Sequence, residues 1–142
     1  MRNLIKKFLV VSLILVTVIS LASCFAKTET EQLWADALYT VDTELGEGAK
    51  TVSVTVEAGE KSIVFTIKTD AEILGDALIA HNLIEGEVGQ FGLYVKKVNG
   101  MLADYDVNQT YWGFYCGGEY MMTGVDLTPI VDGDSYELVL SR

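Results

Sequence analysis

Two segments between residues 50 and 69 carry an apolar side chain at every second position. The alternating residues are Val52, Val54, Val56, Ile63, Phe65 and Ile67. A period of two is typical of strands that bury one face. Gly59 and Glu60 lie between the two segments and are suited to a turn. The pattern therefore predicts a β-hairpin with one apolar face.

The spacing changes to a helical one in TDAEILGDALIAHNLIEG, residues 69–86. The residues that share one helical face are Ile73, Leu74, Ala77, Leu78 and His81. Thr69 and Glu72 have the spacing of a capping box, in which each side chain accepts a hydrogen bond from a free backbone N–H at the helix start. Gly86 is a suitable stop. These positions predict one main helix after the hairpin.

Strand patterns separated by turn residues fill the rest of the chain. The predicted strands are FGLYVKKV (91–98), YWGFYC (111–116) and SYELVLSR (135–142). Asn99-Gly100 is the strongest hairpin signal in the chain. Gly117-Gly118 and the Asp-Gly-Asp run at 132–134 indicate two further turns.

Packing one helix across one face of a mixed sheet would bury all of these apolar faces. We therefore expect an α+β fold that is β-grasp-like, with a mixed sheet of four to six strands and one main helix on one face. Residues 50–142 suffice for one small core. Ahead of them, KTETEQ (27–32) is typical of a polar tether, and LWADALYTV (33–41) fits either a helix or an irregular strand.

The start of the chain predicts a lipoprotein signal peptide over residues 1–23. After a basic start comes an apolar run of 15 residues, 8–22, which is short of the roughly 20 that a spanning helix needs. The run ends in LASC (21–24), which resembles the bacterial lipobox, whose cysteine is diacylated and becomes the new N-terminus. We expect Cys24 to be lipidated and residues 24–49 to form the lipidated cysteine and lead-in segment. The alternative is an ordinary signal peptide or uncleaved anchor with a chance cysteine.

Lipidation at Cys24 would hold the mature protein on the extracytoplasmic face of a bacterial cell membrane through its acyl chains. The formal net charge is −10, and three of the ten basic residues lie in the predicted signal peptide. Such an acidic chain repels nucleic-acid phosphates and anionic lipid head groups. We expect no nucleic-acid partner, and membrane contact through the anchor alone. With Cys24 lipidated, Cys116 has no cysteine left for an intramolecular disulfide.

Motifs for catalysis and metal binding are missing from the sequence. It contains no nucleophile elbow, phosphate-binding loop or Ser-His-Asp pattern. His81 and Cys116 fall short of the three or four ligands of a zinc site, and the aspartates lack the spacing of a calcium loop. Asp132 and Asp134 are better suited to capping a turn through nearby backbone N–H groups. We expect no enzymatic activity and no required cofactor.

YWGFYC is the candidate ligand-binding strand, and alternation divides it into two faces. One face carries Trp112, Phe114 and Cys116, and the other carries Tyr111, Gly113 and Tyr115. We expect the first set in the core, because tryptophan and phenylalanine supply much of a small domain's apolar area. The second set would face outward, where two tyrosines beside a glycine can stack on a planar ring or a sugar. Exposed tyrosines that meet only solvent are the other interpretation.

Four segments, in order, resemble the C-terminal domain of transcobalamin and intrinsic factor and its bacterial relatives. They are ILGDAL, FGLYVKKVNG, YWGFY and GVDLTPIVDGDSYELVL, and the resemblance spans residues 69–140. In those carriers this domain covers cobalamin like a lid. The resemblance implies that the ligand-facing residues are Tyr111, Trp112, Gly113, Phe114 and Tyr115.

Together these patterns predict an extracytoplasmic, lipid-anchored module that binds a small ligand. The resemblance implies cobalamin or another corrinoid, captured for uptake and passed to a membrane transporter. The alternative is a cell-surface module that docks another protein or a glycan through a sheet edge and has no small-molecule ligand.

Overall fold

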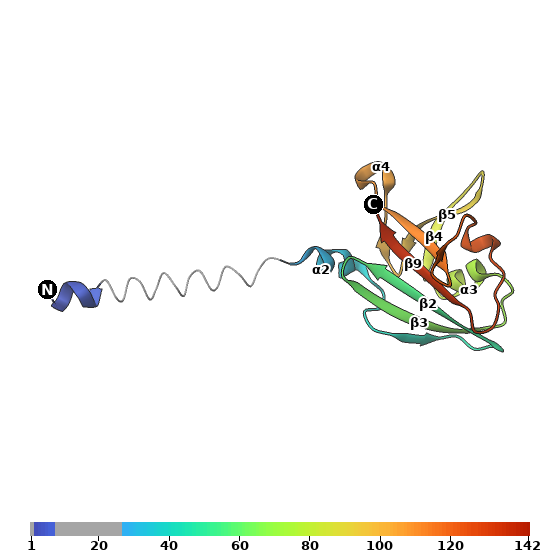
Figure 1. Cartoon of the computed structure of the whole chain (residues 1–142), viewed down its shortest axis with the longest axis horizontal. Coiled ribbons are helices and arrows are strands. Elements are labelled where there is room, and N and C mark those ends of the chain that lie inside the picture. The colour runs from blue at the N-terminus through green and yellow to red at the C-terminus, as the bar shows by residue number, and fades with distance from the viewer. Residues whose placement is uncertain (1, 8–26) are drawn as a thin grey trace.

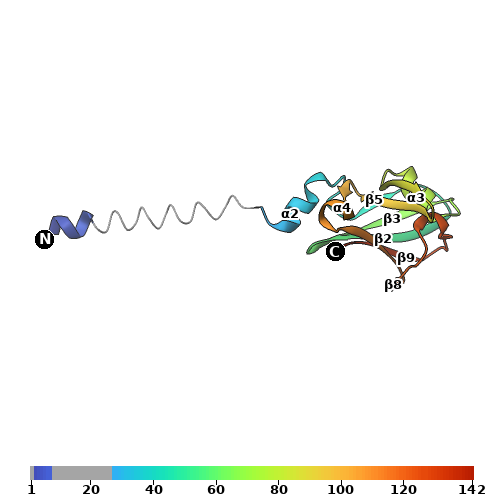
Figure 2. The same cartoon turned by 90° about the horizontal axis from the view of Figure 1, so that it is seen from above.

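The structure, a computed structural model, describes residues 2–7 and 27–142 (Figures 1 and 2). Residues 2–7 are helical. The apolar run at 8–22 and Cys24 lie outside the described residues, so signal cleavage and lipidation stay predictions. Within the two described ranges, no helix is both long enough and apolar enough to cross a bilayer.

A six-stranded mixed sheet forms the larger layer of the fold, with strand order β1-β3-β2-β9-β7-β8. Its strands are β1 (Thr43–Leu45), β2 (Lys50–Ala58), β3 (Lys61–Thr69), β7 (Tyr111–Cys116), β8 (Glu119–Tyr120) and β9 (Ser135–Ser141). The β2–β3 hairpin is antiparallel, as predicted, and β9 lies between β2 and β7, parallel to the first and antiparallel to the second. The expected α+β class and the upper end of the expected strand number are confirmed.

A second, three-stranded antiparallel sheet was not predicted. It contains β4 (Ile84–Gly89), β5 (Gly92–Val98) and β6 (Met101–Leu102). The segment 91–98 is a strand as expected, but it pairs with β4 and β6 and not with the large sheet. Asn99 and Gly100 both have positive φ, 51° and 81°, and form the expected β5–β6 turn. Figure 1 shows the far end of the β4–β5 hairpin standing clear of the large sheet.

The main helix is shorter than the sequence predicts. It is α3 (Leu74–Ala80), and no side chain caps its start. The proposed capping box at Thr69 is wrong, because the Thr69 hydroxyl accepts a hydrogen bond from the Ala71 N–H at 3.0 Å, two residues on. Gly86 is not a helix stop, because it lies in β4 at a bulge where its backbone closely approaches Tyr94 of β5.

The remaining helical turns are short. They are α2 (Glu29–Leu33), η1 (Trp34–Asp36), α4 (Tyr105–Asn108) and η2 (Val125–Leu127). The capping box that does exist belongs to α2, where Thr28 and Glu31 each accept a hydrogen bond from the other's backbone N–H. A polar segment expected to be a tether is therefore a capped helical turn.

Residues between 33 and 41 pack on the core. The Trp34 side chain is buried, and its Nε1–H donates to the carbonyl oxygen of Ala58 at 2.9 Å. Asn99 holds Tyr39 on both sides, since its Oδ1 accepts from the Tyr39 N–H at 2.9 Å and its Nδ2 donates to the Tyr39 carbonyl at 2.8 Å. Asn99 is fully buried although it lies in a turn. This segment is thus η1 followed by irregular chain tied to the β5–β6 turn.

Apolar rows crossing the large sheet form the core. Val54 lies between Phe65 of β3 and Tyr136 of β9, and all three are at most 1% exposed. The Phe114 ring stacks on Tyr136 with ring centres 6.1 Å apart. From α3, Leu74, Ala77 and Leu78 add to the same core. The alternation seen in the sequence is therefore the buried face of this sheet.

Candidate functional site

Strand β7 has the two faces that its sequence predicts. Trp112 and Phe114 are each only 8% exposed, and Cys116 packs at the edge of the same core. Tyr111 and Tyr115 are partly exposed. Gly113 was expected to face outward with the two tyrosines, but it is buried. A Cβ at Gly113 would lie 3.2 Å from the Tyr115 ring, which covers it.

The outward face of β7 is occupied by its own aromatic side chains. The Tyr115 ring meets Tyr120 of β8 edge to face, with ring centres 5.4 Å apart and planes at 78°. Gly113 and Tyr115 line neither of the two cavities that are described next. A planar ligand would therefore lie against the edge of this tyrosine pair and not between Tyr111 and Tyr115.

A cavity of about 230 Å³ lies beside β7. It is lined by residues 93–95 of β5, by Tyr111, Trp112 and Phe114 of β7, by residues 120–125, and by Leu138 of β9. Three of the five predicted ligand-facing residues are thus brought to one cavity. The contributions of β5 and of residues 120–125 were not predicted. The Met121-Met122 pair after an aromatic strand was the available signal.

No side chain that lines this cavity is charged, although the chain as a whole is acidic. The lining is aliphatic, aromatic, methionine, threonine and glycine. Methionine and aromatic side chains adapt to varied apolar shapes. Such a surface favours a neutral ligand with an apolar or planar face.

Among the residues that the structure describes, two buried side-chain polar atoms lack a hydrogen-bond partner, and one of them belongs to Trp112, which lines this cavity. They are the Nε1 of Trp112 and the Oδ1 of Asp126, and both are buried. The other carboxylate oxygen of Asp126 accepts from the Leu93 N–H at 3.0 Å, and Leu93 lines the cavity. Native proteins pair nearly all of their buried polar groups. The unpaired indole N–H of Trp112 is therefore an unusual feature of a residue that lines the cavity.

Exposed apolar side chains surround the mouth of this cavity. Met122 is 92% exposed, Tyr120 is 56% exposed and Tyr94 is 45% exposed. We call these three residues the rim. Isolated exposed apolar residues are ordinary, whereas a group of them beside an apolar cavity is typical of a binding surface.

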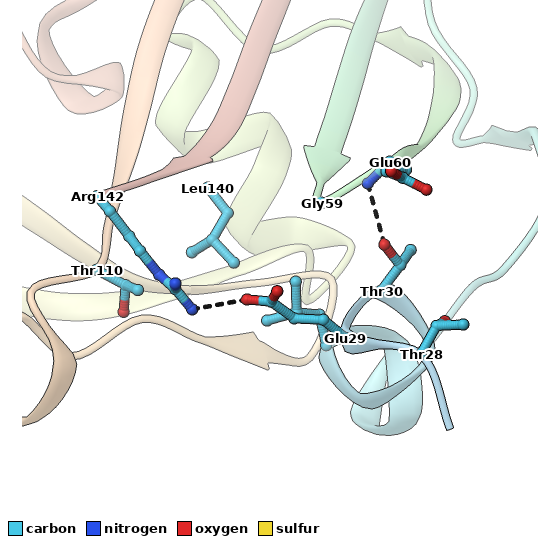
Figure 3. A pocket seen from close by; sticks show the side chains of 9 residues that line it. Thr28, Glu29, Thr30, Gly59, Glu60, Thr110, Leu140 and Arg142 are labelled. Atoms are coloured by element: carbon cyan, nitrogen blue, oxygen red, sulfur yellow. Dashed lines mark hydrogen bonds and ion pairs between the residues drawn. The ribbon is translucent and has the colours of Figure 1, made fainter. Parts of the chain in front are cut away.

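A larger cavity, of about 390 Å³, is lined by Thr110, just before β7 begins, and by residues of α2, the β2–β3 turn and the C-terminal end of the chain (Figure 3). It separates α2 from the β2–β3 turn and from the end of β9. Its hydroxyls are already engaged, since the Thr30 hydroxyl accepts from the Glu60 N–H at 3.1 Å. Glu29 and Arg142 pair at 2.9 Å, and both are exposed. Despite its size, this cavity is a packing seam with satisfied polar groups, and the smaller one is the better candidate.

The single histidine and the described cysteine do not form a site. His81 follows α3 and is half-buried beside Gly46. Burial, together with the charges of Asp134 and Glu119, raises the pKa of the Cys116 thiol, which favours the unreactive protonated form.

The aspartates serve as hydrogen-bond acceptors for the backbone. Asp104 caps α4, and Asp132 accepts from the Thr51 N–H on β2 at 2.7 Å. The sequence predicts that Asp132 caps its own turn, but the backbone N–H that it accepts from belongs to Thr51 on β2. Among residues 2–7 and 27–142, no group of three or more His, Cys, Asp or Glu side chains could hold a metal ion.

Among solved structures, 17 chains are similar to this one, and two of them are informative. No family model matches the chain, and no curated protein does. Haptocorrin, solved in complex with Cbi, is 21% identical with a TM-score of 0.50, over 66% of this chain and 25% of that one. This likeness confirms the expected resemblance at the level of the fold. A "putative metal binding protein" from Ruminococcus gnavus ATCC 29149 is 41% identical with a TM-score of 0.63, over 66% of this chain and 98% of that one. At that identity and coverage, the chain belongs to the family of the Ruminococcus gnavus protein.

Proposed function

We propose that this protein is an extracytoplasmic, lipid-anchored module that binds a small ligand, and that the ligand is cobalamin or another corrinoid. The uncharged cavity at Trp112 and Phe114, with its unpaired indole N–H, is the observation that carries the proposal. The shared fold with haptocorrin, a protein solved with Cbi bound, supports a corrinoid. Cys24 is the proposed anchor, and a membrane transporter is the proposed recipient. The module binds its ligand and does not transform it.

The size of the cavity determines how such a ligand is held. Pockets that enclose a drug-sized ligand are roughly 300–1,000 Å³, and this one is about 230 Å³. A corrinoid is larger, so one edge of it enters the cavity and its flat face rests on the rim. The rim residues Tyr94, Tyr120 and Met122 then bury surface that is exposed in the free protein. We expect modest affinity, in the micromolar range or weaker.

Titration of the soluble chain, residues 25–142, with cobalamin and with cobinamide tests the proposal. Calorimetry and the visible corrin bands report binding, and we expect saturation below millimolar ligand. The absence of saturable binding up to about 1 mM, which corresponds to about −4 kcal/mol, would refute it.

Matched surface variants locate the site. Met122 on the rim and Val41, which does not line the cavity, are both exposed, at 92% and 68%. Met122→Ser should weaken corrinoid binding several-fold, and Val41→Ser should leave it unchanged. Equal effects of the two variants would place the ligand elsewhere.

The second candidate, a surface module that docks a protein or glycan, is favoured by the end of the β4–β5 hairpin. Val88 and Phe91 there are 85% and 89% exposed. The double variant Val88→Ser/Phe91→Ser should abolish binding to intact cells or to a glycan array if this candidate holds. Under the corrinoid proposal, the same variant keeps its full corrinoid affinity.

A further inference from the structure

The turn formed by α4 projects from the same end of the module as α2. Every residue from 105 to 109 is exposed, and Tyr105 and Val107 are 56% and 76% exposed. Thr110, the next residue, is buried and lines the same cavity as residues 28–30 at the start of α2. Figures 1 and 2 both show α4 at this end. We propose that α4 is a second membrane contact, which rests in the head-group layer of the bilayer that holds the lipid anchor.

The proposed anchor at Cys24 holds this end of the module close to the bilayer. Cys24 is four residues before Thr28, the N-cap of α2, and four residues span at most about 14 Å. From there on the chain is fixed to the body of the module. The Thr30 hydroxyl accepts from the Glu60 N–H at 3.1 Å, and Leu33 packs against the core. The inference rests on the proposed function, because the lipidated cysteine is what brings α4 to the membrane.

The exposed side chains of α4 suit a lipid interface. Tyrosine is enriched at membrane–water interfaces, where its ring meets the apolar layer and its hydroxyl meets water. The side chain of Val107 adds apolar surface that is otherwise exposed to solvent. Asp106 on the same turn is also exposed, so a neutral head-group layer suits this contact better than an anionic one. The contact adds to the anchor, which the sequence predicts as the sole attachment.

Tethering makes so small a contact sufficient. Two side chains on one turn would bind a bilayer only weakly from free solution. A short tether raises the effective concentration for a second contact to about millimolar, so a weak contact is occupied once the anchor is in place. A protein partner at α4 would have to fit between the module and the bilayer, within the reach of the segment that joins Cys24 to α2. The chain length therefore favours the lipid surface as the occupant.

The tip of the β4–β5 hairpin is a matched control. Val88 and Phe91 there are 85% and 89% exposed, more than either apolar residue of α4. Figure 1 shows this tip on the side of the module away from α2. If exposure alone decided membrane contact, the hairpin tip would reach the bilayer first. If the anchor decides it, only α4 does.

Relaxation enhancement by a gadolinium chelate on a lipid head group measures which residues lie near the bilayer. The chain 24–142 carrying Cys116→Ala is coupled through the Cys24 thiol to a maleimide lipid in phosphatidylcholine nanodiscs. We expect strong broadening of the backbone N–H peaks of residues 105–108 and of α2, and at least about threefold weaker broadening at residues 88–91. Equal broadening of the α4 and hairpin peaks would overturn the inference.

Surface variants separate a contact from mere proximity. Tyr105→Ser/Val107→Ser should reduce the broadening of the α4 peaks at least about twofold, while the α2 peaks stay broadened because the anchor is unchanged. Val88→Ser/Phe91→Ser should change neither set of peaks. Broadening of α4 that is as strong in the first variant as in the wild type would overturn the inference. If that double variant does not fold, Val107→Ser alone gives the same comparison with a smaller expected loss.

The coupled chain tests this contact whether or not a cell lipidates Cys24, so the two proposals fail separately. Weak broadening at α4, with fatty acid found on Cys24 in cells, overturns the second contact and leaves the anchor standing. Broadening at α4 in a protein whose Cys24 carries no fatty acid in cells supports the contact and refutes the anchor. Peaks of residues 105–108 that shift with protein concentration without lipid would show that a second copy covers the turn, and would overturn the inference.

Discussion

The two tryptophans offer a direct measurement of what an unpaired buried donor costs this protein. Trp34→Phe and Trp112→Phe are the same chemical change at two buried positions, with exposed fractions of 6% and 8%. Each removes an indole N–H and leaves a small space where the second ring was. The two changes differ in what the N–H contacts, since Trp34 is bonded to the Ala58 carbonyl and Trp112 is unpaired.

The expected magnitudes follow from hydrogen-bond energetics. Trp34→Phe loses a bond worth about 1 kcal/mol and leaves a buried carbonyl without its donor, a cost of about 1–3 kcal/mol. Trp112→Phe loses no bond and removes a buried group that carries such a cost already. The space left behind is similar in both and cancels in the comparison. We therefore expect Trp34→Phe to be less stable than Trp112→Phe by about 2 kcal/mol.

Urea unfolding followed by circular dichroism measures this difference, and equal m-values in the two variants show that the unfolded states match. In thermal unfolding, about 4 °C per kcal/mol for a domain of this size gives a Tm gap of about 8 °C. If Trp112→Phe is as destabilised as Trp34→Phe, the Trp112 N–H has a partner in the free protein. The argument for a ligand at that atom would then fail.

Three further predictions concern other parts of the chain. Cys24→Ala should abolish incorporation of an alkyne-labelled fatty acid and release the protein from the membrane fraction. Cys116→Ala should change neither the labelling nor the membrane association. Labelling that persists in Cys24→Ala would refute the anchor. Burial raises the pKa of Tyr136 to about 12. The contribution of this shift to stability is complete below pH 10 and is lost as the pH rises toward 12, by an amount on the order of 2 kcal/mol. Guanidinium unfolding between pH 8 and 12 should show a loss of stability that is smaller in Tyr136→Phe than in the wild type, and equal losses would contradict the prediction. Asn99→Ala removes both hydrogen bonds to Tyr39 and puts a residue that tolerates positive φ less well at φ 51°. Unfolding in urea should therefore show a loss of stability of about 2–3 kcal/mol. Asn99→Gly keeps the turn and should lose less stability, and an Asn99→Ala variant as stable as the wild type would show that the contact is unimportant.

Local patterns in the sequence were sufficient to predict the β2–β3 hairpin and the β5–β6 turn. The period of two in β2 and β3 reports a buried face directly, and the Asn99-Gly100 turn depends on φ preferences within two residues. The faces of β7 were predicted for the same reason, since Trp112 and Phe114 alternate within one strand. Each of these features is determined by residues that are neighbours in the chain.

Features that depend on distant segments were missed. β4 has almost no apolar pattern, because all of its residues after Ile84 are exposed. It is held by pairing with β5 and by ion pairs such as Lys96 with Glu87, at 3.2 Å. The cavity depends on β5 and residues 120–125 converging on β7, and no local signal encodes that convergence. The covering of Gly113 by Tyr115 is likewise a rotamer choice that alternation does not specify.

The attachment of Trp34 and Tyr39 to the body of the fold has a mechanical consequence. A pulling force applied at residue 27 does not first extend residues 34–39. Trp34 is hydrogen-bonded to Ala58, and Tyr39 is hydrogen-bonded to Asn99. β1, which follows, pairs in parallel with β3, so the load would next shear that ladder. Pulling therefore turns the whole module as one body, and the mouth of its cavity keeps a fixed direction relative to Trp34 and Tyr39.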